Sequence, residues 1–391
     1  MNLRRILDII TENSGSVKHD ETPFSSNLKV MSLAQFVGKE APEGDKEVEE
    51  AKLTGVTARK FDEPELTSYL DRILAKDKDK LDKYKRPYIH SGNIIPIVDM
   101  DGKKYDLDKL RQEFTERPLK ILKQNEKMQH SDGSSSIFYN VGLPALKGLA
   151  VDEDTGDFIV IDTCPGAGTC KTYCYAMKGG YVQWKASSLS STKLLNFLYN
   201  DPESFMAKLS NEIRDAEKKY GKKGTKVVIR WHDAGDFFSP QYLEMAYNVA
   251  KENPNVDFYA YTKIASVAKS ARPDNFKINF SMGAQGREEK QIDFTQDKFS
   301  KVVPKELFKD VLEKDDAGKW QYISDQAKQA LKQRMAIKYS IDPKSIITYD
   351  EMMAMGKDSG EKNKWNVIVK PGDGDDAANR NDVLGSYLLI H

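Results

Sequence analysis

The chain has 391 residues, of which 39% are hydrophobic and 31% charged, so it is long enough for one large domain or for two or three smaller ones. Its 60 basic and 60 acidic side chains cancel, which excludes the overall charge excess that drives sequence-independent binding to nucleic acid or anionic lipid. No apolar run approaches the roughly 20 residues that span a bilayer, and acidic residues interrupt the apolar start of the chain, which argues against a secretory signal. We therefore expect an intracellular protein that does not cross a membrane.

The amino-terminal third is expected to hold two regions. Residues 1–62 are rich in Lys, Glu, Gly, Ser and Pro after a short amphipathic start, which indicates a largely irregular, mobile amino-terminal arm. Residues 63–129 are expected to form a small α+β region, because helical apolar spacing flanks a hairpin signal at Asp101-Gly102. The elements expected there are a helix over 64–75, a hairpin over 94–106 and a helix over 107–114.

From residue 130 to residue 391, short apolar strands alternate with amphipathic helices. Asp201-Pro202 and Ser239-Pro240 are typical of helix starts, since the first residue caps the helix and the proline fits its first turn. Alternation of this kind predicts parallel strands with crossover helices, and therefore an α/β domain over 130–391. The expected strands are 158–161, 226–231, 256–261, 277–281, 301–303, 366–369 and 387–391, and the expected helices are 201–220, 240–253, 323–338 and 349–355.

All three cysteines of the chain, Cys164, Cys170 and Cys174, lie in one short loop that follows the first expected strand. An odd number cannot all pair as disulfides, which intracellular proteins seldom keep. Metal binding is therefore the leading interpretation, and three small buried apolar side chains are the alternative. Three thiolates leave one coordination position without a cysteine. An iron–sulfur cluster with one open iron is the favoured centre, and zinc completed by a histidine such as His232 is the alternative.

Polar residues follow each of the first four expected strands, and the carboxyl ends of parallel strands meet at one edge of a sheet. After the cysteine loop come residues 232–236, then Thr262-Lys263, and then residues 282–286. One site can therefore draw on all four strand ends. For residues 230–239 the alternative is a strand end, a turn and a helix cap that bind no ligand.

Several groups within residues 230–239 suit a binding site. Gly235 would let the backbone approach a ligand, and Asp233 or Asp236 would hold an ammonium or hydroxyl group. His232 would act as a proton carrier near neutral pH or as a fourth metal ligand. The acidic loop 370–376 matches a calcium or magnesium loop by composition only, so we expect a turn or a lid there.

The cysteine loop, together with residues 230–239 and 261–263, resembles the phage gene product 88 family over about residues 120–290. More distantly, a cysteine loop after the first strand of a parallel α/β barrel is similar to the radical S-adenosylmethionine enzymes. That likeness implies a partial parallel (β/α) barrel in which the three cysteines hold a 4Fe-4S cluster. It also implies that Ala234-Gly235-Asp236 stands in place of the Gly-Gly-Glu element that contacts the amino group of the cofactor. The spacing here is C-x5-C-x3-C, whereas that superfamily has C-x3-C-x2-C.

The resemblance implies a phage-type iron–sulfur protein of the host-cell cytoplasm. It would bind S-adenosylmethionine and act as a radical enzyme on an unknown substrate, for which a nucleotide or nucleic acid is the natural candidate. The alternative function is a zinc-stabilised binding or structural module without catalysis, closed by the three cysteines and His232. The expected cofactor-binding residues are Asp233, Gly235, Asp236 and Ser281, and the expected catalytic residues are His232, Arg230 and Lys263.

Overall fold

The computed structural model describes residues 52–68, 107–124, 136–177, 185–356, 362 and 364–389. The chain divides into two compact units, Met1–Lys46 and Glu47–His391, and the described residues all belong to the second. The predicted hairpin over 94–106, most of the predicted amino-terminal arm and residues 390–391 lie outside the described residues. Residues 63–68 are helical and α4 spans Leu107–Thr115, so both helices predicted in the small α+β region are present where the structure describes them.

Eight strands form one parallel sheet in the order β11-β12-β13-β8-β7-β6-β5-β2. Every neighbouring pair in it runs parallel. The predicted α/β class is therefore confirmed, but the sheet is open, with β2 and β11 as its edges, and does not close into a barrel. Its strands are β2 (Ser136–Val141), β5 (Lys226–Trp231), β6 (Asp257–Thr262), β7 (Phe276–Ser281), β8 (Phe299–Val303), β11 (Ile346–Thr348), β12 (Trp365–Val369) and β13 (Val383–Leu389).

The helices begin where the capping residues predicted them. The Asp201 carboxylate accepts the Ser204 amide proton (3.0 Å) at the start of α7, and the Ser239 hydroxyl accepts the amide proton of Tyr242 (3.3 Å) at the start of α8. The described helices after α4 are α6 (Lys185–Asn200), α7 (Pro202–Gly221), α8 (Pro240–Glu252), α9 (Ala265–Lys269), α10 (Gly286–Glu289), α11 (Asp325–Tyr339), α12 (Tyr349–Ala354) and α13 (Asp376–Asn379).

A separate antiparallel sheet of three strands corrects one prediction. The run 158–161 does form a strand, β4 (Phe158–Asp162), but β4 pairs with β1 (Ala58–Lys60) and β3 (Lys147–Val151) and not with the parallel sheet. Its four apolar residues are all buried, and such a run is typical of a parallel strand, which is why the sequence misled. The first strand of the parallel sheet along the chain is β2, which was not predicted.

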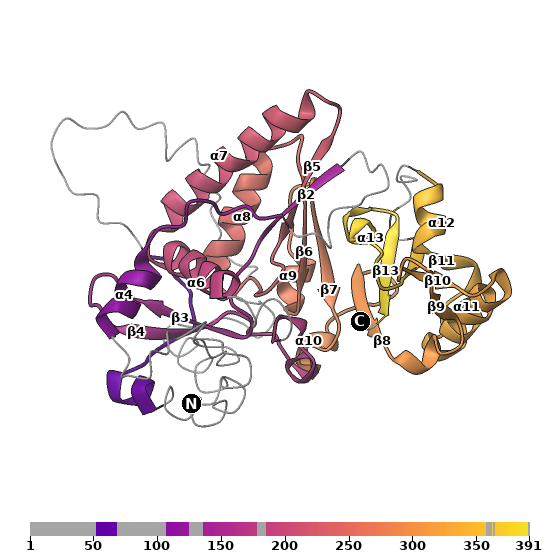
Figure 1. The fold of residues 1–391 in the computed structure, drawn as a ribbon, viewed down its shortest axis with the longest axis horizontal. Coiled ribbons are helices and arrows are strands. Elements are labelled where there is room, and N and C mark those ends of the chain that lie inside the picture. Colours follow the sequence, from indigo (N-terminus) through magenta and orange to yellow (C-terminus); the bar gives the residue numbers. More distant parts are fainter. Residues whose placement is uncertain are drawn as a thin grey trace, which may run out of the picture. The chain divides into compact units, whose positions relative to one another are not determined.

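The two faces of the parallel sheet carry different helices. Trp231 packs against Phe258 and against Tyr242 of α8 on one face, while Tyr259 packs with Ala378 of α13 on the other. Because side chains alternate along a strand, Phe258 and Tyr259 must point to opposite faces. Figure 1 shows α7 and α8 on one side of β5 and β6, and α13 on the other.

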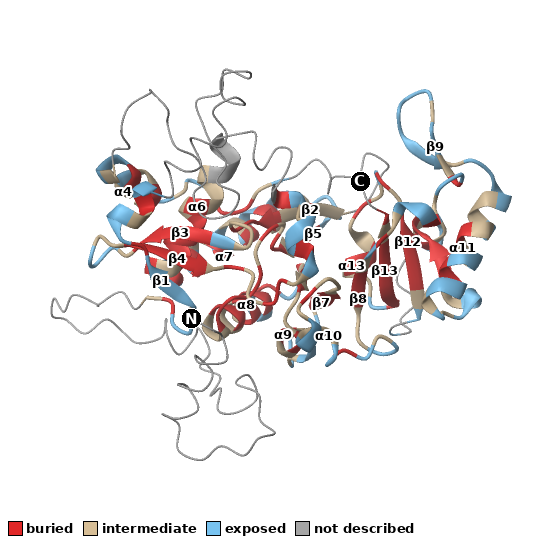
Figure 2. Cartoon of the chain, turned by 90° about the horizontal axis from the view of Figure 1, so that it is seen from below, coloured by how far each residue is buried: buried red, intermediate tan, exposed pale blue. Residues whose placement is uncertain are grey.

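Buried residues are concentrated in the strands of both sheets, as the burial colours show for β3, β4, β12 and β13 (Figure 2). Beyond the parallel sheet, β9 (Leu312–Lys314) and β10 (Trp320–Tyr322) form a short, mostly exposed hairpin. None of the helices in the described ranges combines the length and the apolar character that crossing a bilayer requires.

Candidate functional site

The cysteine loop leaves β4 and docks onto the carboxyl end of β7. The amides of Gly168 and Cys170 both donate hydrogen bonds to the carbonyl oxygen of Gly283, at 3.2 Å and 3.1 Å. The amide of Gln285 donates in return to the carbonyl oxygen of Gly166 (2.9 Å), and its side-chain amide donates to that of Pro165 (2.7 Å). The loop is thus tied by its backbone to the turn after β7, although that turn lies more than a hundred residues further along the chain.

Glycines make this docking possible. A side chain at Gly168 would collide with the backbone carbonyl of Ala284, and one at Gly166 would collide with the carbonyl of Lys263. Gly283 has φ +86°, in the left-handed region that favours glycine. The small residues of the loop are therefore explained first by its close approach to the ends of β6 and β7.

None of the three cysteines forms a disulfide bond. The charge of Cys174 acts on Cys164, and the charges of Cys170 and Cys164 both act on Lys263. Burial raises the pKa of the Cys164 thiol, and the negative charges of Asp236 and Cys174 raise it further. The amide of Leu146 donates a hydrogen bond to the Cys164 sulfur (3.2 Å). The charge of Lys263 interacts with Cys170 and with Cys164. The loop therefore brings its thiols to the edge of the sheet where Asp236 and Lys263 also lie.

Single-ion coordination is a separate question. Over the ranges that the structure describes, no three His, Cys, Asp or Glu side chains are arranged to hold one metal ion. The tetrahedral zinc site made by the three cysteines and His232 is therefore not formed. Zinc–sulfur bonds of about 2.3 Å would require sulfurs about 3.8 Å apart, whereas the separate irons of a cluster hold their thiolates further apart.

Lys263 is held against the end of β7. Its ammonium donates hydrogen bonds to the Ser281 carbonyl oxygen (3.0 Å), the Ser281 hydroxyl (2.8 Å) and the Met282 carbonyl oxygen (2.9 Å). Burial lowers its pKa, and the negative charges of Cys170 and Asp236 oppose that change. All three ammonium protons are used within the protein, so Lys263 supplies a fixed positive charge beside the cysteines.

Asp236 joins the ends of β5 and β6. Its carboxylate accepts hydrogen bonds from the Thr262 hydroxyl (2.7 Å) and from the amides of Phe237 (2.7 Å) and Lys263 (2.8 Å). Burial raises its pKa to about 6, against the lowering effect of these donors. A carboxylate accepts about four hydrogen bonds, so about one acceptor position is left for a ligand. Gly235 has φ +90°. A side chain there would collide with Leu143, so the space beside this glycine is filled by the protein itself.

His232 sits in an aromatic cage on the α8 face. The Trp231 indole donates to the Tyr242 hydroxyl (2.8 Å), which lies 2.7 Å from His232 Nε2. The tyrosine hydroxyl can meet Nε2 as donor or as acceptor, and His232 Nδ1 is buried without a hydrogen-bond partner among the described residues. Burial and the charge of Arg230 lower the His232 pKa to about 3. His232 therefore stays neutral near pH 7 and does not carry protons there.

Asp233 follows in the same turn, with its carboxylate directly over the backbone of Gly142, where a side chain would collide with it. Its charge acts on Lys123, whose pKa burial lowers. Asp233 thus faces the end of β2. It also acts on Tyr175 of the short helix η3 (Tyr175–Met177), which places the carboxylate beside the cysteine loop.

Arg230 connects three parts of the site. Its guanidinium pairs with the Asp375 carboxylate, lies 4.9 Å from the centre of the Tyr261 ring, and donates to the Tyr175 hydroxyl (3.5 Å). Tyr259 also donates to Asp375 (3.0 Å). Sequence reasoning missed Asp375 and Tyr175. The available signal was that an Arg inside an apolar strand needs a buried acidic partner, but nothing local singles out Asp375 among the acids of the loop 370–376.

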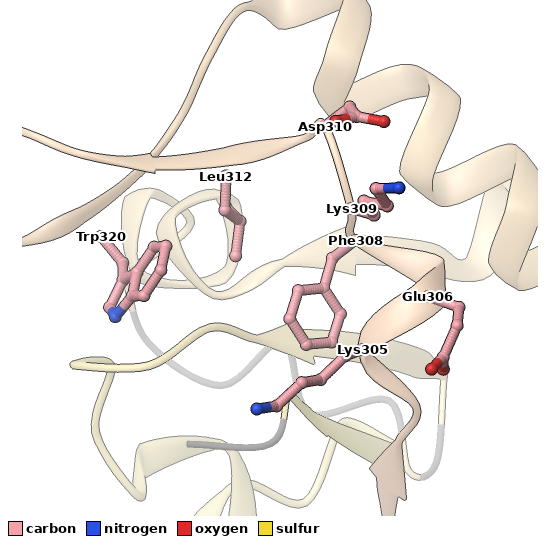
Figure 3. A pocket seen from close by; sticks show the side chains of 7 residues that line it. All are labelled: Lys305, Glu306, Phe308, Lys309, Asp310, Leu312 and Trp320. Carbon is pink, nitrogen blue, oxygen red and sulfur yellow. The ribbon is translucent and has the colours of Figure 1, made fainter.

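A pocket of about 380 Å³ lies at the hairpin of β9 and β10, and contains none of the predicted site residues. Figure 3 shows Phe308, Leu312 and Trp320 around it. Two lysines and two acidic residues cancel in charge along its wall, so it has no preference for ligand charge. Its lining residues are Lys305, Glu306, Phe308, Lys309, Asp310, Leu312 and Trp320.

Comparison with known proteins gives one consistent result. A family model described as gene product 88 matches residues 119–374, which reaches well past the 290 expected from the motifs. The chain is 30% identical to the gene 88 protein of Mycobacterium phage L5 and 29% identical to that of Mycobacterium phage D29, each over 152 residues. Each match covers 37% of this chain and 57% of the relative, so the chain spans a little over half the length of the curated relatives it matches. No solved structure matches it.

Proposed function

The chain belongs to the gene product 88 family, and from that premise we propose that it is an iron–sulfur protein whose cluster is held by Cys164, Cys170 and Cys174. The observation that carries this proposal is the docking of one loop with three thiols onto the carboxyl ends of β6 and β7, next to the partly buried Lys263. In parallel α/β folds this edge is where ligands bind.

The donor set fits a cluster better than a single ion. Three thiolates suit a four-iron cluster with one iron left open. Burial that raises the pKa of Cys164 disfavours its thiolate in the free protein, and a bound cation reverses that effect. A zinc-stabilised module would need a fourth protein ligand, and His232 is instead bonded to Tyr242.

The residues around the cysteines have separable roles in this proposal. A bound cluster of this kind would supply an electron and an open iron for the amino and carboxylate groups of a cofactor such as S-adenosylmethionine. Lys263 offsets the negative charge of the thiolates. Asp236 offers its remaining acceptor position to an ammonium group, and Ser281 is fixed by Lys263 at the edge of the site. Arg230, held by Asp375, orients Tyr175 next to the loop.

Anaerobic purification followed by iron and sulfide analysis and a visible spectrum tests the proposal. We expect a brown protein with several irons per chain, and loss of both iron and colour in Cys170→Ala. Thr172→Ala is the matched control, because this exposed residue of the same loop only hydrogen-bonds the Thr169 carbonyl (2.8 Å). A colourless zinc protein, or an unchanged iron content in Cys170→Ala, would overturn the proposal.

The finer part of the proposal is that S-adenosylmethionine is the cofactor and that a nucleotide or nucleic acid is the substrate. Reduced protein incubated with S-adenosylmethionine should then release 5′-deoxyadenosine, and Asp236→Ala should release less. Since such a cluster needs free thiols, we place the protein in the reducing cytoplasm of the host cell. If the iron-loaded protein releases no 5′-deoxyadenosine, the proposal of a cluster stands and the proposal of S-adenosylmethionine as cofactor is rejected.

A further inference from the structure

Glu289, the last residue of the short helix α10, binds the turn on which the cysteine loop docks. Its carboxylate oxygen Oε1 accepts hydrogen bonds from the amides of Gly283 (2.6 Å) and Ala284 (3.1 Å). Two successive amides that converge on one anion, after a glycine with φ +86°, are typical of an anion-binding nest. Here the anion is a carboxylate of the chain itself, so the turn is held from within the protein.

One peptide unit links this carboxylate to the cysteine loop. The Gly283 carbonyl and the Ala284 amide belong to the same trans peptide, so they point in opposite directions. The amide donates to Glu289, and the carbonyl oxygen accepts from the amides of Gly168 (3.2 Å) and Cys170 (3.1 Å). Rotation of this peptide would break both contacts with the loop, and the carboxylate opposes that rotation. A bond to a charged acceptor also polarises the peptide, which strengthens the bonds that its oxygen accepts.

Cys170 packs against the same turn. A Cβ at Gly283 would collide with the Tyr173 hydroxyl and would lie 3.5 Å from the Cβ of Cys170. The Cys170 side chain therefore begins directly beside the backbone that Glu289 holds. Because Cys170 is only 8% exposed, a change in the turn alters how far its thiol is open to solvent.

Glu289 and the Cys170 thiol also share two charged or polar neighbours. The negative charges of both act on the Tyr173 hydroxyl and on the Lys263 ammonium. The carboxylate is thus close enough to add a negative charge to the surroundings of the thiols, where Lys263 adds a positive one. Its effect on an electron entering the site is opposite in sign to that of the lysine.

We propose that Glu289 is a positioning residue of the cysteine site, which fixes Cys170 through the peptide between Gly283 and Ala284 and whose charge opposes the addition of an electron. The first role does not depend on what the thiols bind. The second rests on the proposed function, since a nearby negative charge lowers the reduction potential of a cluster. The acceptor oxygen carries the first role and the charge carries the second, so different variants separate them.

Alkylation of the iron-free, folded full chain with iodoacetamide tests the first role, with peptide mass spectrometry to follow each cysteine. Glu289→Ala should alkylate at Cys170 about fivefold faster than the wild type, because the loop opens more often once its acceptor is no longer held. Glu289→Gln keeps an acceptor oxygen for both amides and should stay within about twofold of the wild type. Cys164 is the internal reference, because Leu146 and Asp162 hold it and the turn does not.

Glu288→Ala is the matched control. It removes a carboxylate of the same helix that accepts a different amide, that of Ala265 (2.9 Å), and it should leave Cys170 within about twofold of the wild-type rate. Equal acceleration by Glu288→Ala, no acceleration by Glu289→Ala, or a Glu289→Gln variant as fast as Glu289→Ala overturns the positioning role. If Glu289→Ala unfolds, which would accelerate Cys164 as much as Cys170, then Glu289→Asp takes its place, because its shorter side chain withdraws the acceptor.

Potentiometric titration of the iron-loaded protein tests the second role. Glu289→Gln should have a more positive midpoint potential than the wild type, and an equal or more negative potential overturns this role. A wild type that holds no iron rejects the cluster together with the second role, while the alkylation result still decides the first. An iron-loaded wild type with unchanged alkylation in Glu289→Ala rejects the positioning role and keeps the cluster.

Discussion

His232 makes the stability of the folded chain depend on pH in a way that can be isolated. Its ordinary pKa of 6.5 falls to about 3 in the folded protein, because the buried ring is desolvated and lies near Arg230. Below pH 6.5, His232 therefore binds a proton in the unfolded chain but not in the folded chain. By linkage, this group removes stability as the pH falls from about 6.5 toward 3, and has no further effect below that.

The size of the effect follows from the two pKa values. Between pH 7 and pH 5 the unfolded histidine becomes almost fully protonated and the folded one stays neutral, so the free energy of unfolding loses about 2 kcal/mol. Asp236 and Asp373 act in the opposite direction. Burial raises the pKa of each to about 6, so each folded carboxyl gains its proton first as the pH falls. Their contributions are common to the wild type and to a His232 variant.

Only the wild type loses this contribution as the pH falls. We therefore expect the difference in free energy of unfolding between the wild type and His232→Asn to be about 2 kcal/mol smaller at pH 5 than at pH 7. Asparagine tolerates the left-handed backbone at this position, where φ is +68°. The lost hydrogen bond to Tyr242 lowers the stability of the variant at every pH and does not affect the narrowing. Urea unfolding at both pH values measures it. A gap that changes by less than about 0.5 kcal/mol would show that His232 is not held neutral.

Three further outcomes follow from contacts in the site. Gly168→Ala should lower the free energy of unfolding by about 1–3 kcal/mol in urea and reduce bound iron, because its methyl group meets backbone after β7. Gly286→Ala, whose methyl group meets open space, should change neither, and equal effects would refute the docking. Asp375→Ala should lower the free energy of unfolding by about 1–3 kcal/mol, because the partly buried Arg230 loses its acidic partner. Adding Arg230→Met should restore at least half of that loss in the same assay, and no recovery would contradict the pairing. Asp236→Asn turns an acceptor into a donor facing an amide proton, so it should cost about 1–3 kcal/mol at pH 7. The cost should grow by about 1 kcal/mol at pH 5, where the wild-type carboxyl gains its proton, and a smaller cost at pH 5 would refute the raised pKa.

Local signals account for the parts of the fold that the sequence predicts well. Asp201 and Ser239 cap helices through atoms within three residues, so α7 and α8 are readable from short windows. The parallel strands from β5 to β8 follow from apolar runs that alternate with those helices. Residues 158–161 can be predicted as a strand from their own apolar run. The strands that they pair with cannot, because pairing with β3 depends on the turn near Gly156.

Contacts between distant segments account for what the sequence does not reveal. Arg230 and Asp375 are 145 positions apart, and the acidic loop that carries Asp375 reads locally as a turn. The sequence shows that the cysteine loop is rich in small residues. It does not show why, because the cause is the close approach of Gly168 to the backbone that follows β7. Each of these depends on which strands become neighbours.

The docking of the cysteine loop on Gly283 also sets an order for maturation. Cys170 leaves the ribosome about a hundred residues before the carbonyl that receives its amide proton. Until the turn after β7 has been synthesised, the three sulfurs belong to a tethered but unanchored segment and are open to oxidants as free thiols. If the proposed iron–sulfur cluster is held by these cysteines, its loading would follow the synthesis of Gly283, and chains made without iron would fold with the cysteine loop docked but without the cluster.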